Sequence, residues 1–216
     1  MKKGSWTRVG GVGGIVFFVS LAILIVLMPL SHSVSEPAFN ASSNAFLAYA
    51  KSESELPFTL ELLGVLGLFG FVVFGAVLAD RFRAEEERSN VPSILVLLAT
   101  AVFSVLWLAE LGIRLADKFR HQDVDATGAS ILFGLSNGIF VISWAAIGGF
   151  LVAAGVASLS SRAFGSWLGW AALAIGIGML LAVAAPLSAL WFFAYLLFFC
   201  WVLVTSVLLL RSGPRT

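Results

Sequence analysis

The 216-residue chain is strongly apolar: 60% of its residues are hydrophobic, 12% are charged, and the formal net charge is +1. Soluble domains carry about 25% charged residues, so this composition excludes an ordinary soluble domain. The near-neutral charge provides no basic surface for nucleic acid. The single cysteine, Cys200, has no partner for an intrachain disulfide. The composition therefore indicates a protein whose surroundings are a lipid bilayer.

Six apolar stretches follow one another along the chain, and each is long enough to cross a bilayer, which takes about 20 helical residues. We predict membrane-spanning helices over residues 9–30, 57–79, 93–115, 129–157, 167–185 and 188–210. Each must be a helix, because lipid cannot bond to open backbone groups. The prediction is an all-α bundle of six transmembrane helices in one membrane domain, residues 1–216. The fourth span is long enough to tilt or to project beyond the lipid.

The distribution of lysine and arginine predicts the orientation of the bundle. Six spans bring both termini to one side, which collects nine of these residues, against four in the opposite connections. The positive-inside rule then places both termini in the cytoplasm. The first stretch follows basic residues as a signal peptide does, but its length favours a retained helix. We expect Trp6, Trp167 and Trp191, near span ends, to form an aromatic belt at the membrane surface.

The longest connection, residues 31–56, contains a weak helical pattern. Glu36 and Pro37 can start a helix, and apolar residues then recur near helical spacing: Phe39, Phe46, Leu47 and Ala50. We predict a short amphipathic helix that lies on the outer surface or caps the bundle.

Small and hydroxyl residues predict how the helices pack. The GxxxG matches 134–138 and 165–169 and the glycines of the second span, Gly64, Gly67 and Gly70, would let backbones approach closely. The glycine-rich run 10–14 is interpreted as flexible backbone at the entry of the first span. We expect the polar side chains inside the spans to form hydrogen bonds between helices: Asn137, Ser143, Thr205 and Ser206.

Ionisable residues inside spans are costly and are therefore the default candidates for function. Glu61 lies one turn into the second span, and Glu110 and Arg114 lie four residues apart near the end of the third. Ser136 and Asn137 enter the fourth span from the same side. Because neighbouring spans run antiparallel, these five residues are expected to converge on one polar cluster in the outer leaflet.

Two interpretations of this cluster are open. In the favoured one, Arg114 pairs with Glu110 or Glu61 and clamps two helices together, with the arginine also able to reach toward the interface. In the other, the cluster is a ligand or proton site, and the glutamate that does not pair with Arg114 is left without a visible cation.

Templates for catalysis and metal binding fail. His32 and His121 lie in different connections, and Cys200 has no histidine near it in sequence. We predict no catalytic residue, no cofactor and no metal.

Three segments carry a family resemblance: Asn44-Ala-Phe-Leu-Ala-Tyr-Ala50, Trp167-Leu-Gly-Trp170, and Trp201-Val-Leu-Val-Thr-Ser206 followed by Leu210-Arg211. Their arrangement resembles uncharacterised six-helix bacterial membrane proteins of the type grouped as domain of unknown function 4386. The resemblance implies the topology and a bacterial cytoplasmic membrane, and transfers no site residue.

The sequence favours a non-enzymatic accessory, sensory or scaffolding membrane protein that acts through contacts with lipid or with a membrane protein partner; it does not indicate an oligomeric state. The alternative is a small proton-coupled transporter or ligand-binding membrane protein that uses the outer-leaflet cluster. If the cluster lines an open cavity, a ligand site is favoured, whereas ion pairs sealed between helices favour the scaffold.

Overall fold

The computed structural model of the chain describes residues 3–31, 34–38, 41–54, 57–85, 89–120, 123–161, 163–186 and 188–211. Over these residues it contains seven helices: α1 (Lys3–Ser31), α2 (Ser43–Ser54), α3 (Phe58–Arg83), α4 (Val91–Arg120), α5 (Ala126–Ser161), α6 (Ser166–Ala184) and α7 (Leu190–Arg211). All of them except α2 are long and apolar enough to cross a membrane. The predicted all-α fold with six candidate membrane spans is thus confirmed, and the chain is a multi-pass membrane protein.

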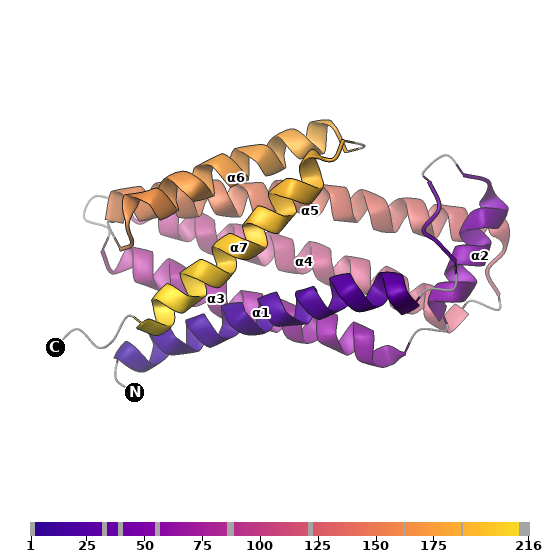
Figure 1. The fold of residues 1–216 in the computed structure, drawn as a ribbon, viewed down its shortest axis with the longest axis horizontal. Helices are drawn as coiled ribbons and strands as arrows, with labels where there is room; N and C mark the ends of the chain where they lie inside the picture. Colours follow the sequence, from indigo (N-terminus) through magenta and orange to yellow (C-terminus); the bar gives the residue numbers. More distant parts are fainter. Residues whose placement is uncertain are drawn as a thin grey trace.

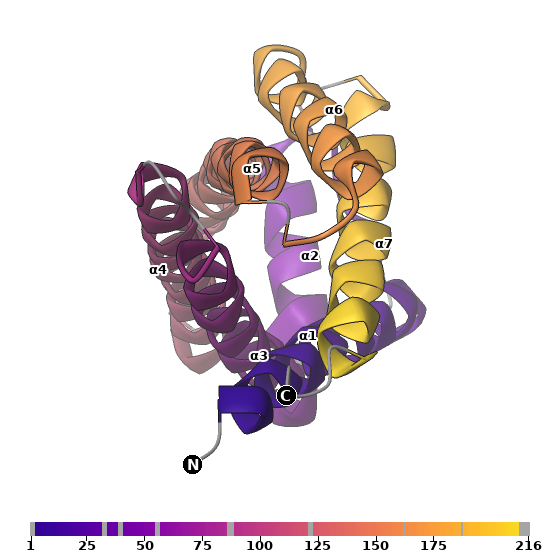
Figure 2. The ribbon, with the colours of Figure 1, turned by 90° about the vertical axis from the view of Figure 1, so that its left-hand side faces the viewer.

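The six long helices form a closed ring. Each packs against its neighbours in the order α1, α3, α4, α5, α6, α7 and back to α1, as the view along the bundle shows (Figure 2). The start of α1 and the end of α7 lie together at one end, which we call the terminal end, and α2 lies at the opposite end, the α2 end (Figure 1).

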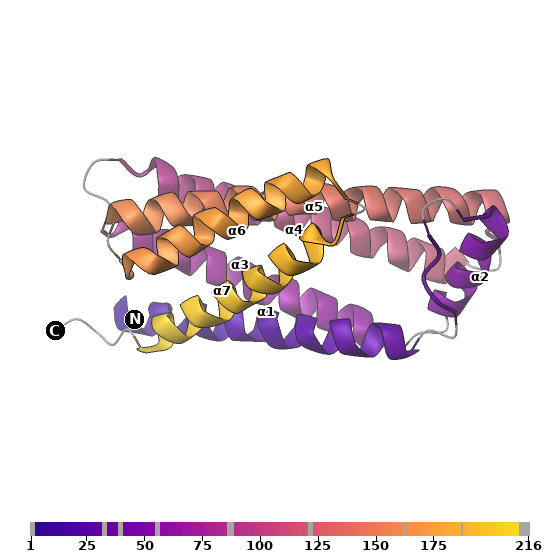
Figure 3. The same ribbon diagram turned by 45° about the horizontal axis from the view of Figure 1, so that its top comes forward.

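The helices differ in length, and this difference shapes the α2 end. With 36 residues, α5 is about 54 Å long, whereas α6, with 19 residues, is about 28 Å long. The hydrocarbon core of a bilayer is about 30 Å thick. The helices α3, α4 and α5 therefore run past the link between α6 and α7, and α2 lies across their far ends (Figure 3). The long fourth span projects beyond the shorter helices, one of the two predicted arrangements.

The half of the ring nearer the terminal end is tightly filled. Aromatic side chains meet at its centre, with Phe71 completely buried and in ring contact with Phe17, Phe103 and Phe150. Glycines bring the surrounding helices together. A methyl group added to Gly13 of α1 would lie 2.7 Å from the backbone oxygen of Gly70 in α3. Such a distance leaves no room for a side chain, so these positions fix how closely the helices approach.

Two packing predictions were wrong. Residues 10–14 are not flexible backbone but part of α1, with Gly10 and Gly13 against α3 and Gly11 and Gly14 against α7. The GxxxG match at Gly134 and Gly138 makes no contact, because a side chain at either position would meet open space. A GxxxG pattern gives a helix a flat face but does not determine whether another helix covers it.

The predicted interhelical hydrogen bonds differ too. Asn137 donates to the Phe133 oxygen at 3.0 Å and Ser143 to the Phe140 oxygen at 2.6 Å, both within α5. Thr205 and Ser206 donate to backbone oxygens four residues earlier in α7. These side-chain donors reach the preceding turn of their own helix, and that bond satisfies the donor without a partner helix.

The predicted amphipathic helix is present as α2, although it begins at Ser43 and not at Glu36 or Pro37, which lie in non-helical chain. Its apolar face caps the α2 end: Phe46 and Ala50 are buried against Ala129 and Phe133 of α5. The rings of Phe46 and Phe133 are 4.7 Å apart. Phe39, which was also predicted to belong to this apolar face, lies outside the described residues.

Candidate functional site

A cavity of about 740 Å³ occupies the α2 end of the ring. Its walls come from the second half of α1, the start of α3, the end of α4, the start of α5 and the start of α7, while α2 and residues 34–36 border it at the end. The volume is within the range of about 300–1,000 Å³ that is usual for small-molecule sites. The filled aromatic half therefore gives way to a hollow half where the α6–α7 pair stops short.

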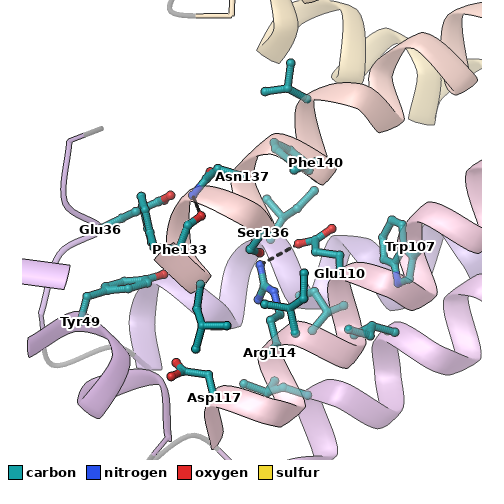
Figure 4. Close-up of a pocket in the computed structure, with 18 of the residues that line it drawn as sticks. Glu36, Tyr49, Trp107, Glu110, Arg114, Asp117, Phe133, Ser136, Asn137 and Phe140 are labelled. Carbon is teal, nitrogen blue, oxygen red and sulfur yellow. Dashed lines mark hydrogen bonds and ion pairs between the residues drawn. The ribbon is translucent and has the colours of Figure 1, made fainter. Parts of the chain in front are cut away.

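All five residues of the predicted polar cluster line this cavity: Glu61, Glu110, Arg114, Ser136 and Asn137. Figure 4 shows Glu110 and Arg114 pointing toward each other beside Ser136. The Arg114 Nη2 atom lies 3.1 Å from the Glu110 Oε1 atom, and neither side chain is fully buried. The five residues that were grouped by their depth in the spans therefore border one cavity.

The clamp between helices forms differently from the prediction. Glu110 and Arg114 are four residues apart on α4, so their ion pair joins no two helices. Glu61 of α3 pairs with Lys118 of α4 at 3.8 Å, and both side chains are at least 85% buried. The second glutamate therefore has a cation, contrary to our expectation. Because α4 continues to Arg120, Lys118 is one turn beyond Arg114, which places its ammonium group near Glu61 and 4.6 Å from the centre of the Phe58 ring.

Sequence reasoning missed further polar groups of the cavity, including Glu36, Tyr49, Asp117 and Tyr195. Asp117 is 8% exposed and lines the wall from the last turn of α4, and Tyr49 reaches the cavity from α2 (Figure 4). Asp117 was assigned to a loop because its helix was predicted to end at residue 115. Residues 116–120 contain no proline or glycine, and this could have indicated that the helix continues. Tyr49 follows Phe46 by three residues, the spacing at which side chains share a helix face.

Aromatic rings make up much of the remaining wall. Trp144, which is 2% exposed, stacks on Trp191 with ring centres 5.4 Å apart and planes inclined by 9°. Both rings line the cavity. The predicted place of Trp191 in a surface belt is therefore wrong, because the start of α7 turns this ring inward. Trp6 and Trp167 are more than half exposed, as a belt requires.

The rim of the cavity includes apolar side chains that face outward. Ile25 of α1 and Phe192 and Leu196 of α7 line it and are nevertheless about half exposed. These residues lie on helices long and apolar enough to cross a membrane, where exposed apolar side chains are suited to lipid. The cavity therefore has an apolar border toward the bilayer and a charged border toward α2.

The described residues contain no group of three or more histidine, cysteine, aspartate or glutamate side chains placed to hold a metal ion. Comparisons of the chain with protein-family models, with curated proteins and with solved structures found no match to any of them.

Proposed function

We propose that this protein is a non-enzymatic ligand-binding membrane protein whose cavity at the α2 end takes up a small amphipathic molecule. One observation carries the proposal: the five costly polar residues of spans two to four line a common cavity of about 740 Å³. Sealed pairs would have favoured a scaffold. The Glu61–Lys118 pair is sealed between α3 and α4, but the Glu110–Arg114 pair forms part of the cavity wall.

The size of the cavity supports an occupant. Its volume of about 740 Å³ is large enough to hold a small molecule. The rim leaves the space open to the surroundings, so molecules can enter and leave it.

The lining supports an amphipathic occupant over plain water. Its deeper part is built from rings and aliphatic side chains, such as Leu21, Phe140 and Trp144, while the charged groups gather toward α2. Water alone would leave the apolar surface wet, at about 25 cal/mol for each Å². A molecule with an apolar chain and a polar head would cover both parts.

A transporter is less well supported, because four buried hydroxyl groups of the filled half are bonded within their own helices and do not line a path. The hydroxyl groups of Thr100, Ser104, Thr205 and Ser206 there donate to oxygens of their own helices, and all four residues are buried. Aromatic rings close the centre of the ring between them and the cavity.

We further propose a bacterial cytoplasmic membrane, with both termini in the cytoplasm and the cavity facing outward. The nine-to-four excess of lysine and arginine on the terminal side supports this orientation. Alkaline phosphatase fused after residue 211 should be inactive, and fused within the connection before α3 it should be active; the reverse result would invert the proposed topology.

Ligand binding can be tested by protecting a cysteine in the cavity. In the full chain carrying Cys200→Ser, Ser136→Cys places a thiol in the cavity wall, and Leu135→Cys places one on the adjacent outward-facing position, which is 51% exposed. Both variants are reconstituted in phosphatidylcholine nanodiscs and alkylated with N-ethylmaleimide, which is uncharged.

Twelve-carbon amphiphiles with neutral, cationic and anionic heads are then added in turn. At least one should slow alkylation of Ser136→Cys and leave the Leu135→Cys rate unchanged. Equal slowing of both variants would reflect membrane partitioning only. That result, or no slowing by any head group, would reject the proposed binding.

A further inference from the structure

The charge of the cavity wall suggests which head group it accepts. The lining contains four carboxylates, Glu36, Glu61, Glu110 and Asp117, and one guanidinium, that of Arg114. Lys118 stands outside the lining, where it pairs with Glu61. Even with Lys118 included, the carboxylates outnumber the cations by two. An anionic head group would add like charge to a site that is already acidic, at a cost that grows as water is excluded.

Aromatic rings line the same cavity as these carboxylates. Glu110 lies between Arg114 and Trp107 along α4 (Figure 4). Trp107 is in edge contact with Phe103, so its ring is held in place. Phe140, on the facing helix α5, contacts the Trp144 ring at 5.4 Å. Carboxylates combined with ring faces form the environment that recognises quaternary ammonium groups.

The same preference for cations is already visible within the protein. The Lys118 ammonium group lies between the Glu61 carboxylate, at 3.8 Å, and the Phe58 ring, at 4.6 Å from its centre. This pair closes the boundary between α3 and α4 beside the cavity. An alkylammonium head placed between Glu110 and Trp107 would repeat this arrangement about two to three turns away along α4.

From this charge and ring arrangement we propose that the cavity selects single-chain amphiphiles with an ammonium head, an inference that rests on the proposed ligand binding. The head would lie beside Glu110, between the Trp107 ring and Asp117, which are about 15 Å apart along α4. The chain would lie along Leu21, Phe140 and Trp144 toward the apolar rim.

The cysteine-protection assay measures this selectivity directly. On the Ser136→Cys, Cys200→Ser background, dodecyltrimethylammonium, dodecanol and dodecyl sulfate are titrated separately. Because a desolvated contact between a cation and a ring is favourable, the cation should protect at a concentration about tenfold lower than dodecanol. Dodecyl sulfate should protect least.

A matched pair of charge removals locates the effect. Asp117→Asn removes a carboxylate from the cavity wall, whereas Asp123→Asn removes one at the same end whose side chain is 69% exposed and pairs with Arg120. Asp117→Asn should raise the protecting concentration of the cation severalfold and leave that of dodecanol unchanged. Asp123→Asn should change neither. Unchanged dodecanol protection also shows that the variant keeps its folded cavity.

The outcomes separate the two proposals. Protection by dodecanol or dodecyl sulfate at concentrations equal to those of the cation, or equal effects of the two aspartate substitutions, would overturn the ammonium selectivity and leave ligand binding intact. If no compound protects Ser136→Cys, both proposals fail.

Ammonium heads occur in free amines and in choline lipids, and one more compound separates these sources. Dodecylphosphocholine carries the same ammonium group behind a phosphate. Protection equal to that of dodecyltrimethylammonium would point to a lipid-derived ligand, and much weaker protection would point to a free cation.

Discussion

The two ion pairs at the α2 end should contribute unequally to stability, and comparing Lys118→Met with Arg114→Met tests this. Lys118 is 6% exposed in its side chain and joins α4 to Glu61 of α3. Arg114 is 27% exposed and pairs within its own helix. Methionine keeps much of the length of both side chains and removes only the charge, so the two substitutions are matched.

The magnitudes follow from distance and burial. Two unit charges 3.8 Å apart interact by about 4 kcal/mol at an effective dielectric constant of 20. Removing one partner of a buried pair costs about 3–5 kcal/mol. The long Glu61–Lys118 distance favours the lower value, so we expect Lys118→Met to lower the free energy of unfolding by about 3 kcal/mol. Water screens the Glu110–Arg114 pair, and Arg114→Met should cost about 1 kcal/mol or less.

The measurement is unfolding in mixed micelles by titration with dodecyl sulfate, followed by circular dichroism. The loss in free energy of unfolding for the double variant Glu61→Gln with Lys118→Met should be about 2 kcal/mol smaller than the sum of the losses for the two single variants. In the double variant neither charge is left buried without its partner. Equal losses for Lys118→Met and Arg114→Met, or strict additivity in the double variant, would refute the assignment of the clamp to Lys118.

Two further predictions concern packing. A methyl group on Gly155 would lie 2.8 Å from the Gly169 oxygen, so Gly155→Ala should lower the free energy of unfolding by about 1–3 kcal/mol. At Gly138 a methyl group would meet nothing, so Gly138→Ala should raise the free energy of unfolding by up to about 1 kcal/mol through helix propensity. The same unfolding titration measures both variants, and a change of the same sign in both would contradict the packing. Phe46→Ala should speed hydrogen exchange of the Ser43–Ser54 amides by exposing the cap, while Lys51→Ala, on the exposed face of α2, should not.

Much of the fold could be predicted because the bilayer imposes it. About 20 apolar residues in a row can only be a helix in lipid, and six such stretches leave few arrangements. The helix ends were harder to predict. Hydropathy marks where lipid ends, around residue 115, but the backbone of α4 continues to Arg120 because nothing in that segment disfavours a helix. That difference of five residues concealed Asp117 and Lys118.

The site could be predicted as a set of residues but not as a cavity. Depth alone brought Glu61, Glu110 and Asn137 together. The space between them depends on the lengths and tilts of the helices. The link between α6 and α7 lies short of the first turns of α5, and α2 covers the gap at that end (Figure 1). No local pattern in the sequence records where one helix stops relative to another, so the inward turn of Trp191 could not be foreseen.

Close glycine contacts hold the filled half of the ring together. At Gly13, Gly70 and Gly155, an added side chain would collide with a neighbouring helix. Gly134 and Gly138 meet nothing within 4 Å because they lie on the exposed face of α5, away from the residues that line the cavity. Bulky rings and charged side chains line the cavity instead. Substitutions in the cavity wall should therefore alter binding more than folding, and substitutions at the contact glycines should do the reverse.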